Sequence, residues 1–280
     1  MSGQHARVAA VAEVHPYSGY RDAISRLSGA QKTAARGAPA YSRYVNRRLG
    51  RYLAAAAFGA GLTPNVVTGI SAVFTFSGIG LLLAFPPSGW LGLAVSMCLV
   101  VGYALDSADG QLARLTGLGS PAGEWLDHMV DAVKTSVLPL ALLIALYRFE
   151  SVDRVWLLVP VGSAVVAAVL FFSMILTEQL RRQRGVVSVA DDVAGPSWLR
   201  SLLVVPMDYG VLCLSFLVYG AVPVFMMLYT AIFAATAAFL AMASVKWFRE
   251  LQTIYGTATN SVPAPERRAN GMPSSSESGA

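Results

Sequence analysis

The sequence predicts an all-α membrane protein with six transmembrane helices, preceded by an amphipathic helix at the membrane surface. Three observations support this fold class. Hydrophobic residues make up 55% of the 280 residues and charged residues only 13%, roughly half their share in a soluble domain. The apolar residues are gathered in runs long enough to cross a bilayer, and the positive charges favour one side of these runs. This composition excludes an ordinary soluble domain.

Six apolar runs are the expected spans. The run from Asn65 to Phe85 carries no charged residue, and at about 1.5 Å per helical residue it crosses a hydrocarbon core about 30 Å thick. Thr63 and Pro64, directly before it, favour a helix cap and a first helical turn. The expected runs are 65–85, 90–113, 121–147, 155–178, 203–220 and 224–247.

The composition outside the spans divides the rest of the chain. The N-terminal part has scattered charges and no sustained apolar core, and the C-terminal part is rich in Ser, Pro, Ala and Gly, which is typical of disorder. We therefore expect a weakly structured cytoplasmic segment at 1–37, the amphipathic helix at 38–62, a six-span membrane domain at 63–250 and a disordered tail at 251–280.

The segment before the first span has two faces. Apolar positions recur at helical spacing at Tyr41, Val45, Leu49, Tyr52 and Ala56, and basic positions fall on another face at Arg43, Arg47 and Arg51. A helix of this kind lies in the interface of a membrane. Its pattern fits a helix that only anchors the chain as well as one that also contacts a substrate.

The basic residues predict the orientation of the chain. Six spans place both termini on one side, and eighteen of the 21 Lys and Arg residues fall on that side, whereas only Arg148 and Arg154 fall on the other. We expect a multi-pass protein of the cell membrane with its termini and acidic stretch facing the cytoplasm. The net charge of +5 follows from this asymmetry, so no nucleic-acid partner is expected.

Four aspartates stand out, because they lie at the ends of two neighbouring spans. Asp106 and Asp109 are three residues apart and Asp127 and Asp131 are four apart, so each pair shares a helix face. The short segment GLGSPAG between the spans lets the two pairs face each other. Converging carboxylates repel one another unless cations lie between them, and hard oxygen ligands favour Mg²⁺ or Mn²⁺. Solvated surface acids are the plain alternative, but the depth of Asp131 within a span favours a functional site.

Small residues and one arginine accompany these acids. Gly110, Ala113 and Gly123 leave room for a base or a phosphate to approach the helix backbone, and Arg114 can bind phosphate oxygens through its guanidinium fork. Taken singly, such small residues are more often sites of helix packing. The complete pattern is Asp106-x2-Asp109-Gly110-x2-Ala113-Arg114-x8-Gly123-x3-Asp127-x3-Asp131.

This pattern resembles the signature of the CDP-alcohol phosphotransferase family, and TPNVVT at 63–68 is similar to the start of the first span in that family. The resemblance implies transfer of a substituted phosphate from a CDP-alcohol, with CDP-diacylglycerol as the expected donor, to an acceptor hydroxyl, with release of CMP. It also implies a homodimer in phospholipid biosynthesis. It implies two divalent metal ions on Asp106, Asp109, Asp127 and Asp131, a catalytic base at Asp131, and a CDP site formed by Asn65, Thr68, Asp106, Gly110, Ala113, Arg114 and Gly123.

Two other functions remain open from the residues alone. An intramembrane prenyltransferase also binds a pyrophosphate through Asp-rich helices and Mg²⁺, but it does not require the glycines and the arginine at this spacing. A cation-coupled transporter places acids along a path near the bilayer midplane. Here the acids crowd at one end of two spans, which favours the phosphotransferase.

The acceptor is not specified by the sequence. Arg181, Arg182 and Arg184 are candidates for binding an acceptor phosphate, although such a basic run is commonly an orientation signal. Lys134, one turn beyond Asp131, is a candidate for contacting the acceptor or for pairing with an acid. Asp208 is a further acid near a span end, with no role predicted for it.

Overall fold

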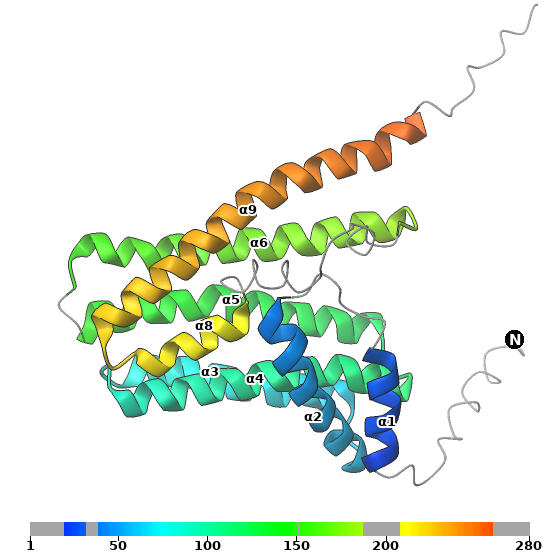
Figure 1. Cartoon of the computed structure of the whole chain (residues 1–280), viewed down its shortest axis with the longest axis horizontal. Coiled ribbons are helices and arrows are strands. Elements are labelled where there is room, and N and C mark those ends of the chain that lie inside the picture. Colours follow the sequence, from blue (N-terminus) through cyan, green and yellow to red (C-terminus); the bar gives the residue numbers. More distant parts are fainter. Residues whose placement is uncertain (1–19, 32–38, 150–151, 187–207, 260–280) are drawn as a thin grey trace, which may run out of the picture.

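A computed structural model describes residues 20–31, 39–149, 152–186 and 208–259. These residues form helices and no strand, which confirms the all-α prediction (Figure 1). The α-helices are α1 (Tyr20–Gln31), α2 (Arg47–Gly59), α3 (Pro64–Ala84), α4 (Gly89–Thr116), α5 (Pro121–Phe149), α6 (Leu158–Gln183), α8 (Tyr209–Ser215) and α9 (Val222–Thr259).

Five helical segments are long and apolar enough to cross a membrane: α3, α4, α5, the segment Arg154–Gln183 that contains α6, and α9. The expected run at 203–220 is described only from residue 208 onward, and residues 203–207 lie outside the described part of the chain. Its described part, Tyr209–Val218, is an apolar helix shorter than a span. The multi-pass character is therefore clear, and the count of six spans stays a prediction.

Local sequence signals define the ends of the central helices. The Thr63 hydroxyl accepts a hydrogen bond from the Val66 amide at 3.4 Å, and Pro64 opens α3, as the sequence predicts. Ser88 caps α4 in the same way, with its hydroxyl accepting from the Leu91 amide at 3.1 Å. Gly117 ends α4 with a left-handed φ of 68°, a conformation that a side chain disfavours.

The helices are arranged around α3, α4 and α5, with α6 and α9 on the periphery. α3 packs against both α4 and α5, α6 packs between α5 and α9, and α8 packs on α4 (Figure 1). Within their most apolar windows 44% of α4 but only 6% of α6 is buried. The core of the bundle therefore lies between α3, α4, α5 and α8, and most of α6 is left to face its surroundings.

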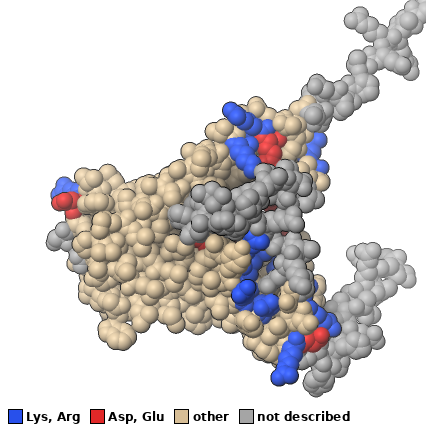
Figure 2. Space-filling model, viewed as in Figure 1, with Lys and Arg blue, Asp and Glu red and all other residues tan. Residues whose placement is uncertain are grey.

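A continuous apolar cluster fills this core. Leu99, Leu142 and Phe216 are fully buried and come from three different helical segments. Dispersion contacts between closely packed side chains hold helices together inside a membrane, where the lipid is as apolar as the protein. On the outside, Trp90 and Tyr147 are 83% and 79% exposed. Charged side chains gather mainly at the end of the bundle where α2, α6 and α9 present their polar residues (Figure 2).

α2 precedes the first span, where the amphipathic helix is expected. Val45, Leu49, Tyr52 and Ala56 are exposed together, and the opposite side of the helix is buried against α4 through small residues such as Ala54. The exposed apolar stripe is the face that an interfacial helix turns toward lipid. The position of α2 in a membrane interface remains a prediction.

Two boundaries differ from the expected ones. The segment 1–37 contains the twelve-residue helix α1, which packs on α2 through Ala23 and Leu27, although its sequence shows no sustained apolar run. α9 continues to Thr259, nine residues beyond the expected end of the membrane domain at 250. The remaining residues of these two segments, 1–19, 32–37 and 260–280, lie outside the described part.

The contact between α3 and α4 yields a stability prediction. A Cβ atom at Gly102 would overlap the Thr75 side chain and would lie 3.2 Å from the Ser71 carbonyl oxygen, itself fixed by the adjoining helix. We expect Gly102→Ala to lower the free energy of unfolding by about 1–3 kcal/mol, because the two helices must separate. Thermal unfolding in detergent measures this change. Gly80→Ala, where no atom lies within 4 Å, is the control, and equal melting temperatures for the two variants would contradict the expectation.

Candidate active site

The four predicted aspartates come together on α4 and α5, at the end of the bundle where α4 ends and α5 begins. Asp127 lies within electrostatic range of both Asp106 and Asp109, and Asp131 within range of Asp106. Asp109 and Asp127 are the outer members of the two pairs, and Asp106 and Asp131 lie one helical turn deeper in the bundle. The convergence expected from the helical spacing is therefore present.

Lys134 joins the two inner aspartates. Its ammonium lies 2.9 Å from Oδ1 of Asp106 on α4 and also forms an ion pair with Asp131 on its own helix. The residue is only 5% exposed, and its Nζ lies 5.5 Å from the centre of the Tyr209 ring. Of the two roles expected for Lys134, the structure therefore displays the pairing with acids.

Asp109 is held by hydrogen bonds from two sides. The Thr68 hydroxyl of α3 donates to Oδ2 at 2.5 Å, and the Gly110 amide donates to Oδ1. Because Asp109 is 5% exposed, these bonds replace hydration that the carboxylate loses on burial. Thr68, which was expected at the edge of the CDP site, thus contacts the carboxylate cluster directly.

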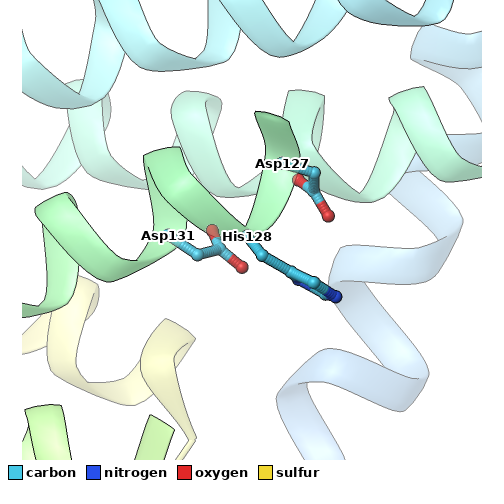
Figure 3. A group of neighbouring side chains, drawn as sticks. All are labelled: Asp127, His128 and Asp131. Atoms are coloured by element: carbon cyan, nitrogen blue, oxygen red, sulfur yellow. The ribbon is translucent and has the colours of Figure 1, made fainter. Parts of the chain in front are cut away.

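Asp127, His128 and Asp131 form a second grouping on α5 (Figure 3). Each offers one ligand atom, and these atoms lie within 4.8 Å of one another. Oδ1 of Asp127 is buried and, within the described residues, has no hydrogen-bond partner. A buried oxygen without a partner is costly, so this atom suits a cation. The sequence pattern of paired carboxylates does not include His128, although its spacing of three residues from Asp131 places the two on one helix face.

A cavity of about 530 Å³ opens beside the outer aspartates, and we call it the glycine cavity. Its wall comes from the beginnings of α3 and α5, the end of α4 and the end of α6. Among the predicted site residues it includes Asn65, Thr68, Asp109, Gly110, Ala113, Arg114, Gly123, Asp127 and Arg182. Asp106, Asp131 and Lys134 do not line it and lie deeper.

Gly123 lies close to the Asn65 side chain in this wall. A Cβ atom at Gly123 would lie 2.9 Å from Oδ1 of Asn65 and 3.2 Å from the Ser120 hydroxyl, so a side chain there would displace the Asn65 amide from its place in the cavity wall. Gly110 has a different neighbour, since the Arg114 guanidinium lies 3.6 Å from the position of its missing Cβ. Arg114 therefore folds back over Gly110 and borders the cavity as a fixed positive charge.

The three arginines at 181–184 have separate surroundings. Arg181 donates two hydrogen bonds to Glu250 of α9, at 2.9 and 2.6 Å, and Arg184 lies 4.2 Å above the Tyr255 ring. Arg182 pairs with Glu124 at 2.6 Å, and both line the glycine cavity. Of the three, Arg182 lines the glycine cavity, and the role of this run in binding an acceptor phosphate stays a prediction.

Asp208 links the juxtamembrane region to α8. Its Oδ2 accepts a hydrogen bond from the Ser42 amide at 2.8 Å, and its Oδ1 caps α8 by accepting from the Gly210 amide at 3.0 Å. Asp208 is 1% exposed, and these backbone donors replace the hydration that its carboxylate loses on burial. These contacts give Asp208, for which the sequence predicted no role, a structural function.

The sequence is similar to known proteins of one family. The family model described as CDP-alcohol phosphatidyltransferase matches residues 61–257. The chain is 33% identical over 86 residues to the CDP-diacylglycerol–serine O-phosphatidyltransferase of Encephalitozoon cuniculi, covering 29% of this chain and 22% of the relative. It is 35% identical over 78 residues to the choline/ethanolaminephosphotransferase 1 of Arabidopsis thaliana, covering 26% and 20%.

These local matches span about a fifth of the length of the curated relatives. The family match is far longer, since it covers the five span-length segments and the whole carboxylate pattern. It favours the phosphotransferase over the prenyltransferase and transporter alternatives. The chain belongs to the CDP-alcohol phosphatidyltransferase family.

Proposed function

We propose that this chain transfers a substituted phosphate group from a CDP-alcohol to the hydroxyl of an acceptor alcohol and releases CMP. The observation that carries this proposal is the glycine cavity, in which the small residues and the arginine of the sequence pattern line one space together with Asp109 and Asp127. A volume of about 530 Å³ lies within the usual range of ligand sites.

The proposed place of the CDP group follows from the charges of this wall. The Arg114 side chain over Gly110 offers a guanidinium to a phosphate, and the glycine backbones let the nucleotide approach closely. Arg182 stands across the cavity and is 53% exposed, so it is free to exchange Glu124 for a phosphate at little cost. We propose Asn65, Thr68, Asp106, Gly110, Ala113, Arg114 and Gly123 as the CDP site.

The carboxylates suit divalent cations. All four aspartates offer oxygen ligands, and the partnerless Oδ1 of Asp127 lacks the positive partner that a buried carboxylate needs. We propose that Asp106, Asp109, Asp127 and Asp131 hold Mg²⁺ or Mn²⁺, two ions in all, with His128 at hand as a nitrogen ligand. Such ions, when bound, neutralise charge on a pyrophosphate and on the departing CMP.

Asp131 is the proposed catalytic base. It lies one turn deeper than Asp127, so an acceptor hydroxyl that comes from inside the bundle meets it first. The acceptor oxygen forms a bond to the phosphorus, the bond from phosphorus to the CMP oxygen breaks, and the hydroxyl proton passes to Asp131. Lys134, paired with the same carboxylate, orients it for this role.

The proposal also concerns the identity of the donor, the assembly of the protein and its orientation in the membrane. CDP-diacylglycerol is the first donor to test, because the name of the Encephalitozoon relative contains it. We further propose that the chain lies in the cell membrane with the active site and the termini facing the cytoplasm, because the basic residues are distributed unevenly between the two sides. A homodimer is proposed on the resemblance to the family alone.

Removal of the proposed metal site should abolish turnover. We expect Asp127→Asn to lower the rate of CMP release by about 100-fold or more, because a ligand and a charge are lost together. EDTA should have the same effect on the unmodified protein, reversed by Mg²⁺ or Mn²⁺. Asp153→Asn, at an exposed acid outside the cluster, is the matched control. Full CMP release in EDTA would disprove the metal assignment.

The role of Asp131 as a base can be separated from a role as a ligand. Asp131→Asn removes proton-accepting ability but keeps the shape and one oxygen, so the chemical step should fall by about 10²–10⁴-fold while donor binding survives. Calorimetry with CDP-diacylglycerol and the initial rate of CMP release measure the two effects on the same preparation. If donor affinity and the rate of CMP release fall together, Asp131 is chiefly a metal ligand. An unchanged rate of CMP release would disprove both its role as a base and its role as a ligand.

Lys134 should stabilise the metal-free protein. Lys134→Met leaves Asp106 and Asp131 as buried carboxylates without their cation, and we expect the free energy of unfolding to fall by about 3–5 kcal/mol. Thermal unfolding in detergent with EDTA measures this loss. Lys246→Met, at an exposed position of α9, is the control, and equal stability of the two variants would show that the buried pair contributes nothing.

A further inference from the structure

The Lys134 ammonium has a third neighbour besides its two carboxylates. Its Nζ lies 5.5 Å from the centre of the Tyr209 ring, within the distance of about 6 Å at which a ring face attracts a cation. Lys134 is buried, so little water screens this attraction, and a cation–π contact is strongest where water is excluded. The reaction proposed above assigns no part to Tyr209.

The two carboxylates alone do not fix the ammonium in one place. Lysine carries its charge on a flexible four-carbon stem, so the ammonium follows whichever acid attracts it more strongly. When Asp106 and Asp131 bind cations, as proposed above, those cations repel the ammonium. The Tyr209 ring differs from both acids, because its attraction does not depend on their charge and because hard cations prefer oxygen ligands to a ring face. The ring therefore restrains the ammonium in either state of the acids.

Asp208 fixes the start of α8, and with it the backbone of Tyr209. Its buried carboxylate accepts hydrogen bonds from the Gly210 amide at 3.0 Å and from the Ser42 amide at 2.8 Å. Tyr209 lies between Asp208 and Gly210 and is the first residue of α8. The cap therefore holds the backbone of Tyr209 at the point from which its side chain reaches Lys134.

Two further tyrosines restrain the ring itself. Tyr103 of α4 meets it edge to face, with ring centres 5.1 Å apart and an angle of 74° between the ring planes. Tyr41, which precedes α2, stacks on Tyr103 with ring centres 6.4 Å apart. Tyr41 also lies against Gly210, where a Cβ atom would overlap its ring. Because aromatic pairs favour a few relative orientations, the Tyr209 ring is held from α4 and from the segment before the first span.

The Tyr209 hydroxyl takes no part in these contacts. Its oxygen is buried and has no hydrogen-bond partner within the described residues. The ring, and not the hydroxyl, therefore supplies the contacts with Lys134 and Tyr103. Phenylalanine would keep these contacts, whereas a hydroxyl that binds a substrate would be lost with the same change.

We propose that Tyr209 is a positioning residue of the reaction. Its ring holds the Lys134 ammonium against the two inner aspartates, and so keeps Asp131 in the orientation in which it accepts the proton of the acceptor. This inference rests on the proposed function for the role of Asp131. Neither Tyr209 nor Lys134 lines the glycine cavity, so the effect falls on the chemical step and not on nucleotide binding.

Removal of the ring tests the role in the reaction. We expect Tyr209→Leu to lower kcat by about five- to thirtyfold, the equivalent of about 1–2 kcal/mol of lost cation–π attraction, and to change the KM for CDP-diacylglycerol by less than about twofold. Tyr209→Phe should restore kcat to within about twofold of the unmodified protein. CMP release is followed with the best acceptor from a screen of alcohols, and rates are divided by the number of CDP-binding sites that calorimetry finds.

Phe225→Leu is the matched control for the loss of a buried ring. Phe225 of α9 is fully buried, and its ring packs on those of Phe216 and Tyr229. We expect this change to lower the melting temperature and to leave kcat per binding site unchanged. A loss of kcat equal to that of Tyr209→Leu would show general packing damage and would overturn the proposal.

Fluorination separates the charge distribution of the ring from its packing. Phenylalanine with no, one, two or three ring fluorines at position 209 keeps nearly the same shape, but each fluorine weakens the negative face of the ring. We expect kcat to fall at each step, and the melting temperature in EDTA to fall in the same order. The melting temperature reports on the contact with Lys134 in the metal-free protein and needs no turnover. Constant values of both quantities across the series would disprove the contact.

The outcomes separate this inference from the proposed function. If Tyr209→Phe loses as much activity as Tyr209→Leu, the hydroxyl acts in the reaction and the positioning role is wrong. A graded melting temperature with a constant kcat would also exclude that role. A graded melting temperature without CMP release from any CDP-alcohol would disprove the transferase, while the placement of Lys134 by Tyr209 would stand.

Discussion

The ion pairs of Lys134 are the constraint on which the centre of this protein depends. Four carboxylates within electrostatic range repel one another, and their repulsion grows as water is excluded. A buried ammonium between Asp106 and Asp131 offsets part of that repulsion and ties α5 to α4. Among the described residues, no lysine pairs with Asp109 or Asp127. The buried ammonium therefore offsets the repulsion at the deep end of the cluster.

The walls of two cavities differ in charge in the same way as the two ends of the carboxylate cluster. The glycine cavity borders the outer aspartates and two arginines, so its wall carries charges of both signs. A second cavity of about 240 Å³, which we call the apolar cavity, lies between α5, α6, α8 and α9. Its wall is mostly aliphatic and aromatic, and it also includes the buried side chain of Asp208.

The sequence predicts those features that depend on local spacing. The pairs Asp106–Asp109 and Asp127–Asp131 converge because intervals of three and four residues share a helix face, and Thr63 with Pro64 marks the start of α3. Contacts between distant residues leave no such pattern. The hydrogen bond from Arg181 to Glu250 joins positions 69 residues apart. Arg181, a candidate for binding an acceptor phosphate, therefore links α6 to α9 in the structure. Helix α1 was missed because its overall apolar content is low, although Ala23, Ile24 and Leu27 recur at helical spacing on the face that packs on α2.

α9 has a consequence that follows from its length. At 38 residues it is about 57 Å long, nearly twice the thickness of a hydrocarbon core. Its inner half carries Ile232 and Phe233 of the apolar cavity, and its outer half is clamped to α6 through Glu250 and Tyr255. The contacts of Arg181 with Glu250 and of Arg184 with the Tyr255 ring hold α6 and α9 together in this outer half, so the two helices extend beyond the hydrocarbon core as a joined pair.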